Sequence, residues 1–287
     1  MNSVFSNAER AEILTQALPY IKRYVGKIVV VKYGGNAMIN ETLKQQVMQD
    51  IILLNTIGIK IILVHGGGPE VTDLMGKLGI QSQFIDGLRV TPKDAVDVVQ
   101  MALAGKVNKS LVSLLASKGG SAIGLCGMDA SLIQTVKLDE VHGYVGQIVG
   151  INAQPVLDLL DKGYIPVIST LGIDAEGNAY NINADTAAAY IAGALKAERL
   201  IMMTDIAGIC RDAKDPSTLI PDMTVPEAKE LYKEGVISGG MIPKVDCCIT
   251  AIEQGVKNVV IMDGRIPHSI LMELLTNEGA GTWIKGE

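Results

Sequence analysis

Four short segments rich in glycine, lysine, asparagine or aspartate lie at predicted strand ends or helix starts. In the first, residues 32–36 (KYGGN), Gly34 and Gly35 let the backbone approach a ligand closely and expose consecutive N–H groups. Lys32 adds a positive charge beside them. This pattern predicts an anion-binding turn after a strand, and a tight turn with a surface lysine is the alternative interpretation.

The second segment, residues 65–69 (HGGGP), places three glycines between a predicted strand and a predicted helix. The free N–H groups and the dipole at a helix N-terminus both favour an anion, so Gly67 and Gly68 are expected to contact one. The spacing matches neither GxxxxGK[ST] nor GxGxxG, so it indicates neither a P-loop nor a dinucleotide fingerprint. We interpret His65 as a packed residue.

Two further segments carry charge at predicted helix starts. Residues 181–186 (NINADT) project alternate polar side chains and bring Asp185 to a helix start, where a simple N-cap is the alternative. Residues 238–244 place Lys244 in the first turn of a helix. A cation is unfavourable at a helix N-terminus, and an anionic ligand bound there would explain the position of Lys244.

Two lysines, one aspartate and two glycine turns suit phosphoryl transfer, in which catalysis is mostly positioning and charge neutralisation. These segments offer no general base, which fits a carboxylate acceptor because such a group is already ionised at neutral pH. Residues 86–91 (DGLRVT) place Arg89 just before a helix. Arginine binds carboxylates in a bidentate fork, so Arg89 is the candidate for a substrate carboxylate, and a surface arginine is the alternative.

The elements that must position these residues alternate between short apolar runs and amphipathic stretches, which predicts an α/β protein with a mainly parallel sheet. Apolar residues make up 48% of the chain but aromatic residues only 4%, as in an aliphatic sheet buried by helices. Strands are predicted at residues 27–31, 59–64, 165–169, 199–204, 258–262 and 282–285. Helices are predicted at residues 41–57, 153–162, 184–195, 225–234, 242–254 and 268–276.

Two regions are less regular. Thr91 is predicted to cap a helix that runs to residue 104, and a second helix follows to residue 118. Residues 121–126, 132–137 and 145–151 are predicted to be short strands paired as antiparallel hairpins. In parallel sheets ligands lie at the carboxyl ends of the strands, where the glycine-rich turns are predicted.

Composition excludes several other classes of function. The net charge of −6 argues against a nucleic-acid partner. Four cysteines without a CxxC pair are expected to be reduced core thiols of a cytoplasmic protein. Three histidines without ligand spacing indicate no protein-bound metal. The acidic N-terminus does not resemble a signal peptide, and no apolar run approaches the roughly 20 residues of a membrane span.

Six motifs in order resemble the amino acid kinase family, in particular its members that phosphorylate N-acetyl-L-glutamate. They are residues 30–38 (VVKYGGNAM), 64–70 (VHGGGPE), 86–91 (DGLRVT), 181–186 (NINADT), 204–209 (TDIAGI) and 239–245 (GGMIPKV). The resemblance spans nearly the whole chain. It implies an open αβα sandwich, with residues 26–170 forming a lobe for N-acetyl-L-glutamate and residues 171–287 a lobe for ATP. Trp283 departs from the family, in which a smaller apolar residue is more usual.

The resemblance also implies roles for individual residues. Lys32 and Lys244 would stabilise the transition state, with Asp185 orienting both. Substrate and phosphoryl contacts would come from Gly34, Gly35, Gly67, Gly68, Arg89, Asn181 and Asn183. Nucleotide contacts would come from Thr204, Asp205, Ile206, Ala207, Gly208, Ile209 and Met241. Mg²⁺ would be held mainly by the phosphates of ATP and by water.

Regulation is a further implication of the resemblance. Residues 1–25 contain an amphipathic stretch that Pro19 would kink, and similar N-terminal helices interlace three dimers into a homohexamer in arginine-inhibited relatives. L-arginine would then inhibit the enzyme by binding near Lys196, His268, Glu278 and Gly281. A helix that merely covers a core edge is the alternative. Some relatives are also controlled by a PII signalling protein.

Rival functions share part of this pattern. Within the family, uridylate kinase, carbamate kinase, glutamate 5-kinase and aspartokinase use similar lysines and glycine turns, whereas the DGLRVT segment favours N-acetyl-L-glutamate. A catalytically silent sensor of arginine or nucleotide could also keep the fold. The combination of Lys32, Asp185 and Lys244 argues against such a sensor, because it would not need all three.

Overall fold

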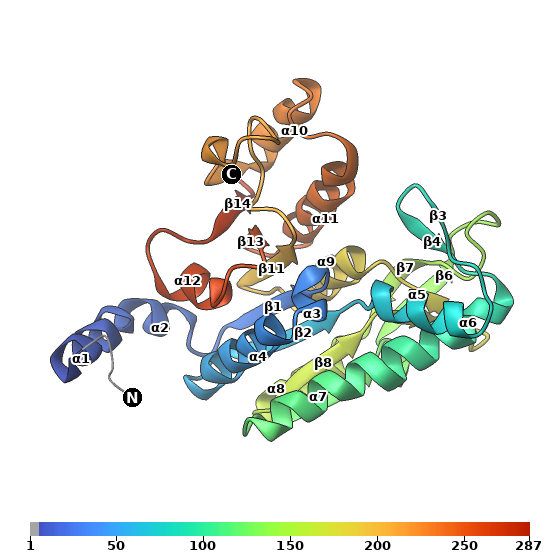
Figure 1. The fold of residues 1–287 in the computed structure, drawn as a ribbon, viewed down its shortest axis with the longest axis horizontal. Helices are drawn as coiled ribbons and strands as arrows, with labels where there is room; N and C mark the ends of the chain where they lie inside the picture. The colour runs from blue at the N-terminus through green and yellow to red at the C-terminus, as the bar shows by residue number, and fades with distance from the viewer. Residues whose placement is uncertain (1–5) are drawn as a thin grey trace.

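The computed structural model of the protein describes residues 6–287 and contains a central sheet of eight strands (Figure 1). The strands are, in order across the sheet, β12 (Asp222–Thr224), β14 (Gly281–Lys285), β13 (Asn258–Asp263), β11 (Arg199–Thr204), β1 (Ile28–Tyr33), β2 (Lys60–His65), β8 (Ile165–Ser169) and β5 (Ala122–Cys126). All neighbours pair in parallel except β13 and β14, which are antiparallel. A mainly parallel sheet was predicted and is confirmed.

Helices cover both faces of this sheet. Alternate side chains of a strand point to opposite faces, so Val29 and Val31 join one apolar core and Val30 the other. The first core is closed by α4 (Glu41–Thr56), α7 (Asn108–Ser117) and α12 (Ser269–Leu275). The second is closed by α8 (Gln154–Asp161), α9 (Ala184–Ala194), α10 (Val225–Lys233) and α11 (Ile242–Glu253). The predicted αβα sandwich is therefore confirmed.

Two smaller sheets lie beside one end of the sandwich (Figure 1). One has four strands in the order β10 (Ala179–Asn181), β9 (Leu171–Ile173), β6 (Ile133–Lys137) and β7 (Gly146–Ile151). The other is the hairpin of β3 (Gln83–Ile85) and β4 (Leu88–Val90). The antiparallel pairing of residues 132–137 and 145–151 is confirmed by β6 and β7. The prediction was wrong for residues 121–126, because β5 pairs in parallel with β8 at the edge of the main sheet.

The helical region after β4 also differs from its prediction. α5 (Gly68–Lys77) precedes the hairpin, and α6 (Lys93–Gln100) follows it. Between α6 and α7 the chain forms a π-helix, η1 (Met101–Val107), instead of a break between two helices. The N-cap of α6 is Pro92, without a side-chain cap bond, so the predicted capping role of Thr91 is wrong. Thr91 instead joins a β-bridge with Gly143.

The N-terminal segment forms two helices, α1 (Asn7–Gln16) and α2 (Leu18–Tyr24). The break at Ala17 lies just before Pro19, as proline geometry predicts. Figure 1 shows α1 projecting away from the body of the molecule. Short helices α3 (Asn36–Ile39), η2 (Asp129–Ser131), η3 (Pro216–Thr218) and η4 (Gly239–Met241) complete the described chain.

The cysteines are less uniform than predicted. All four are free thiols, but only Cys248 is buried in the core, and the other three are half-buried. Across residues 6–287, no helix is both long and apolar enough to cross a membrane.

Candidate active site

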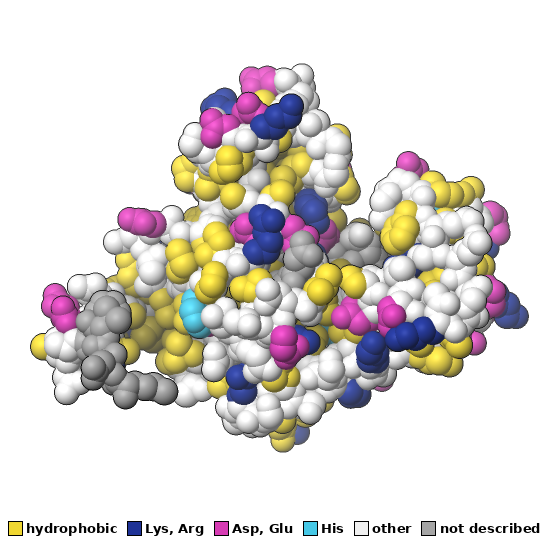
Figure 2. All heavy atoms as spheres, viewed as in Figure 1, with side chains coloured by type: hydrophobic (Ala, Val, Ile, Leu, Met, Phe, Trp, Pro, Cys, Tyr) yellow, Lys and Arg dark blue, Asp and Glu magenta, His cyan; other side chains and the backbone are white. Residues whose placement is uncertain are grey.

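The carboxyl ends of β1, β2 and β11 converge on the N-terminus of α9, and the predicted catalytic residues lie there. Lys32 is the fifth residue of β1, so it lies on the strand and not after it. Asp185 is in the first turn of α9, and Lys244 is in the first turn of α11. Figure 2 shows basic and acidic side chains gathered beside the hollow between the upper and right-hand parts of the molecule.

These three residues form a compact ionic group. The ammonium nitrogen of Lys32 lies 2.7 Å from Oδ1 of Asp185, and that of Lys244 lies 2.7 Å from Oδ2. Lys32 also donates to the carbonyl of Met203 on β11, at 3.4 Å. Lys32 and Asp185 are buried, whereas the side chain of Lys244 is 29% exposed. One carboxylate therefore holds two ammonium groups at the foot of an accessible cleft.

The charge of Asp185 is fixed by its two partners. Burial by itself would raise the pKa of this carboxyl group, but the charges of Lys32 and Lys244 outweigh burial and hold the pKa at about 2. Asp185 is therefore ionised at neutral pH. The group of three residues carries a net charge of +1, which suits an anionic ligand.

The first glycine turn lies against this group. A Cβ atom on Gly34 would lie 3.3 Å from the ammonium nitrogen of Lys32, and one on Gly35 would lie 2.8 Å from Oδ1 of Asp205. Gly35 also has a φ of +66°, which favours glycine. The turn after β1 thus leaves room for a ligand next to Lys32.

The second glycine turn is held by its neighbours. Gly67 is the N-cap of α5, and a Cβ atom there would lie 2.7 Å from Leu103 and 3.1 Å from Val107 on η1. His65, which is fully buried, contacts the carbonyl oxygen of Gly66 at 2.8 Å and Asn108 at 3.1 Å. Burial lowers the pKa of His65 to about 4, so its ring is neutral, as expected of a packed residue.

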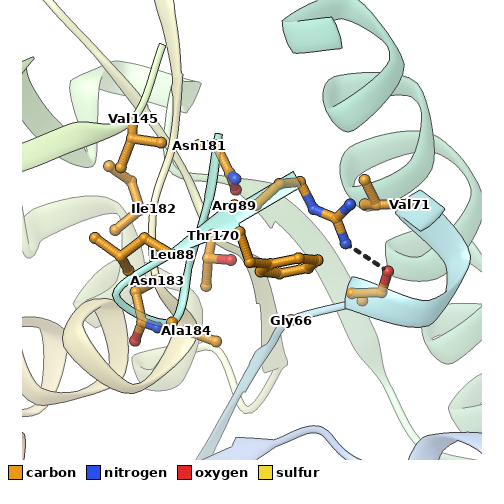
Figure 3. Close-up of a pocket in the computed structure, with 14 residues that line it drawn as sticks. Gly66, Val71, Leu88, Arg89, Val145, Thr170, Asn181, Ile182, Asn183 and Ala184 are labelled. Atoms are coloured by element: carbon orange, nitrogen blue, oxygen red, sulfur yellow. Dashed lines mark hydrogen bonds between the residues drawn. The ribbon is translucent and has the colours of Figure 1, made fainter. Parts of the chain in front are cut away.

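Arg89 lines a small pocket of about 200 Å³, here called the Arg89 pocket, together with Gly66–Gly68, Asn181 and Asn183 (Figure 3). Its guanidinium donates to the carbonyl of Gly68 and to the hydroxyl of Thr72, both at 2.9 Å, and to Ser82. The ring of Phe84 lies 4.7 Å from the guanidinium carbon. Burial lowers the pKa of Arg89, which nonetheless remains a cation.

Two asparagines complete the polar wall of this pocket. Asn181, at the end of β10, donates its amide to the hydroxyl of Thr91 at 3.3 Å. Asn183 is the N-cap of α9, and its side-chain oxygen accepts from the backbone N–H groups of Asp185 and Thr186. The cap at this helix is therefore Asn183, which leaves the carboxylate of Asp185 for the lysines. The pocket is smaller than the roughly 300–1,000 Å³ typical of ligand sites, so it suits a small acid.

Two neighbouring pockets lie on the other side of the ionic group. The first, here the lysine pocket, measures about 480 Å³ and is lined by Lys32, Gly35, Lys244 and Met241, with Thr204 to Ile206. It shares Asp205, Ile206 and Met241 with the second pocket, which adds Ala207, Gly208 and Ile209 and measures about 390 Å³. All the residues predicted to bind nucleotide thus line one or both of these neighbouring pockets.

The two binding regions meet at the ionic group. Ala184, next to Asp185 in the chain, lines the Arg89 pocket, whereas Lys32 and Lys244 line the lysine pocket. Ligands in the two pockets would therefore approach each other at the lysines. This arrangement is suited to transfer of an anionic group from a larger ligand to a small acid.

The residues predicted to bind arginine are only partly brought together. His268 and Glu278 line a pocket of about 790 Å³ between α1, α2 and α12, here the α1–α12 pocket. Lys196 lies beyond the end of α9, where it donates to the carbonyl of Gln254 at 2.5 Å. Gly281 begins β14 and packs against Ile261. Neither Lys196 nor Gly281 lines this pocket.

Several residues that line the Arg89 pocket were not predicted from the sequence. Thr170 follows β8, and its place after a predicted strand could have identified it. Phe84 and Gly87 belong to the β3–β4 hairpin, which was not predicted. Its two-residue turn, Asp86-Gly87, has positive φ at both positions, and Asp-Gly is a common signal for such a turn.

Within residues 6–287, no group of three or more His, Cys, Asp and Glu side chains is placed to hold a metal ion. A divalent cation at this site would therefore depend on ligand oxygens and water. Lys32 and Lys244 supply positive charge from the protein next to this site.

Comparison with known proteins agrees with this geometry. Residues 27–263 match the model of the amino acid kinase family. The chain is 54% identical to the acetylglutamate kinase of Clostridium beijerinckii, over 98% of this chain and 100% of that protein. It is 50% identical to the acetylglutamate kinase of Thermosynechococcus vestitus, over 99% and 96%.

Solved structures share the fold. N-acetylglutamate synthase from Neisseria gonorrhoeae, complexed with coenzyme A and N-acetyl-glutamate, superposes with a TM-score of 0.85 at 26% identity. The match covers 96% of this chain and 63% of that one. Carbamate kinase from Giardia lamblia bound to AMP-PNP gives a TM-score of 0.66 at 20% identity, over 92% of this chain and 100% of that one, which supports the fold alone. From its family match, its close relatives and its fold, this chain belongs to the amino acid kinase family.

Proposed function

We propose that this protein transfers the γ-phosphoryl group of ATP to the γ-carboxylate of N-acetyl-L-glutamate, forming N-acetyl-L-glutamyl 5-phosphate for arginine biosynthesis. The observation that carries the proposal is the Lys32–Asp185–Lys244 group between a small arginine-lined pocket and a larger cleft. The relatives named acetylglutamate kinase support the choice of acceptor. Residues 26–170 would form the lobe for the acid and residues 171–287 the lobe for ATP.

In the proposed reaction, an oxygen of the acceptor carboxylate attacks the γ-phosphorus of ATP. A new P–O bond forms while the bond from phosphorus to the β–γ bridging oxygen breaks, and ADP leaves with that electron pair. The acceptor is already ionised, so no residue needs to remove a proton. Lys32 and Lys244 neutralise charge on the transferred group and on the leaving oxygen, while Asp185 keeps both ammonium groups in place.

The glycine turns and Arg89 position the reactants. N–H groups of Gly34, Gly35, Gly67 and Gly68 would contact phosphoryl and carboxylate oxygens. Arg89 would bind the α-carboxylate, after giving up part of its contact with Gly68 and Thr72. Mg²⁺, bound by phosphate oxygens, would supply further charge neutralisation.

The test is ADP release with ATP and Mg²⁺, measured with N-acetyl-L-glutamate, glutamate, aspartate, carbamate and UMP as acceptors. Turnover with N-acetyl-L-glutamate alone is expected. Turnover with carbamate or UMP would instead assign another activity of the family, and the volume of the Arg89 pocket, about 200 Å³, argues against a nucleotide acceptor. No turnover with any acceptor would favour a silent sensor of arginine or nucleotide.

We also propose that L-arginine inhibits the enzyme by binding in the α1–α12 pocket. Glu278 and His268 line this pocket, and a carboxylate there would pair with a guanidinium. Support comes from the N-acetylglutamate synthase of Neisseria gonorrhoeae in complex with coenzyme A and L-arginine, which superposes with a TM-score of 0.80 at 25% identity. Lys196 and Gly281 would contribute only after a rearrangement.

The same assay tests this inhibition when L-arginine is added. Inhibition is expected for the wild type, and Glu278→Gln should need a higher arginine concentration while keeping its turnover without arginine. Glu253→Gln, an exposed carboxylate on α11 outside the pocket, is the matched control. Equal inhibition of wild type and Glu278→Gln would remove Glu278 from the site.

A further inference from the structure

The β3–β4 hairpin places Phe84 and Arg89 over the Arg89 pocket, and its β4 strand is held to α5 by the hydrogen bonds of Arg89 to Gly68 and Thr72. The rest of the hairpin has less support. Its strands have three residues each, every residue of β3 is exposed, and the hairpin forms a separate two-stranded sheet. Such a hairpin is at best marginally stable by itself. The contacts that fix it to the body of the protein therefore decide how well the pocket is formed.

The base of the hairpin is held by backbone bonds. Thr91, just after β4, donates its N–H to the carbonyl of His142 at 2.9 Å and accepts from the N–H of Tyr144 at 2.6 Å. The same loop between β6 and β7 also bonds to Asn181 at the end of β10, whose N–H donates to the carbonyl of Tyr144 at 2.8 Å. These bonds fix where the hairpin emerges, but they do not reach its tip.

The side chain of His142 reaches that tip. Its Nδ1 lies 2.8 Å from Oδ2 of Asp139 and 3.0 Å from Oδ1, and its Nε2 lies 3.3 Å from the carbonyl oxygen of Ile85, the last residue of β3. A carboxylate and a carbonyl only accept hydrogen bonds. Both contacts are hydrogen bonds only when both ring nitrogens carry a proton, that is, in the imidazolium form.

We propose that the imidazolium of His142 is a positioning residue that ties the β3–β4 hairpin over the Arg89 pocket, and that its deprotonation releases the tip of the hairpin. In the neutral ring Nδ1 keeps its proton toward Asp139, and the lone pair of Nε2 then faces the lone pairs of the Ile85 oxygen. The contact becomes repulsive. Phe84 then loses its fixed position over Arg89, and the pocket binds its small acid less well.

The charges around the ring favour its protonated form, in which Nε2 can donate to Ile85. The hydrogen bond to Asp139 raises the pKa of His142, and the charge of Asp86, at the turn of the hairpin, acts in the same direction. Asp139 stays ionised because its bonds to His142 hold its own pKa below the usual value. The hydrogen bond from Nε2 of His142 to Ile85 is therefore formed below the usual histidine pKa, near 6.5. It is lost as pH rises through the raised pKa of His142.

The inference rests on the proposed function only for its kinetic readout. The KM for N-acetyl-L-glutamate of the wild type should rise about 2- to 10-fold as pH is raised from about 6 to about 9, as expected for the loss of one hydrogen bond. His142→Leu should show the high KM at every pH, with kcat and the KM for ATP little changed. Asp139→Asn should move the transition to lower pH. Lys137→Gln, at the end of β6 and paired with Glu140 of the same loop on the surface, is the matched control and should follow the wild type.

Two measurements on the enzyme without substrate test the contact between His142 and the hairpin. Neither depends on which acceptor the enzyme uses. Hydrogen–deuterium exchange at the imidazole C2 position, followed by mass spectrometry, gives the pKa of each of the three histidines. Amide exchange of residues 83–91 should be faster in His142→Leu than in the wild type at low pH, and equal at high pH. A pKa for His142 at or below 6.5, or equal amide exchange of both proteins at low pH, would overturn the inference. If only the acceptor assignment is wrong, both exchange results still stand.

Discussion

Two ammonium groups lie 2.7 Å from the two oxygens of one buried carboxylate, that of Asp185. Replacement of Asp185 by asparagine keeps the shape of the side chain but removes its charge. Lys32, which is buried, would then lose its counter-ion, and both lysines would lose their fixed position. Charge-stabilising groups in active sites contribute about 10²- to 10³-fold to turnover.

We therefore predict that Asp185→Asn lowers kcat by about 10²- to 10³-fold with a much smaller change in the KM for N-acetyl-L-glutamate. Lys244→Ala should act in the same way, and the double variant should lose less than the sum of the two effects because the residues act as a unit. Asp246→Asn, exposed on the same helix as Lys244, is the control. An unchanged kcat in Asp185→Asn would refute the role assigned to the carboxylate.

Single residues were the scale at which the sequence was most informative. Lys32 and Lys244 lie close to glycine turns and Asp185 lies at a predicted helix start, so local pattern identified all three as candidates. The family resemblance then assigned their roles. Phe84 could not be found in this way, because its value comes from lying over Arg89, a contact set by the hairpin. The guanidinium carbon of Arg199 lies 3.9 Å from the ring centre of Trp283, and nothing in the sequence around either residue predicts this contact.

At the scale of elements, the π-helix η1 sets the position of the second glycine turn. Leu103 and Val107 pack so closely on Gly67 that a Cβ atom there would lie 2.7 Å and 3.1 Å from them. Nothing in the sequence predicted this π-helix, because its apolar residues also fit an ordinary helix. β5 was misassigned for a related reason, since a short run with a glycine does not reveal which distant strand it will pair with.

We predict that Gly67→Ala lowers kcat/KM for N-acetyl-L-glutamate by at least about 10-fold, because α5 or η1 must shift to accept the methyl group. Gly76→Ala, in the same helix, has open space at its Cβ position and should stabilise the protein by up to about 1 kcal/mol. Steady-state kinetics and thermal unfolding of both variants give the comparison. Wild-type kinetics in Gly67→Ala would mean that the turn tolerates displacement and does not position the reactants.

At the scale of the whole molecule, α1 stands out because it buries no side chain against the rest of the described chain. No residue of α1 is buried, and Leu14 is 72% exposed and Ile13 51% exposed. An isolated helix of this length is marginal in water even with its Ser6 capping box. An apolar surface on such a helix needs a partner, and a second copy of the same helix would supply it by symmetry.

We therefore predict that the protein is a hexamer in which α1 helices pair between dimers, and that removal of residues 1–16 leaves dimers. Light scattering coupled to size-exclusion chromatography would measure the mass of both forms. Inhibition by L-arginine should weaken in the truncated protein because α1 supplies one wall of the α1–α12 pocket, whereas turnover should persist because α1 lines neither the Arg89 pocket nor the lysine pocket. Glu12→Gln, an exposed change on α1, should stay hexameric. A truncated protein that keeps both the hexamer mass and its arginine sensitivity would show that α1 is neither the link between dimers nor a wall of the inhibitor site.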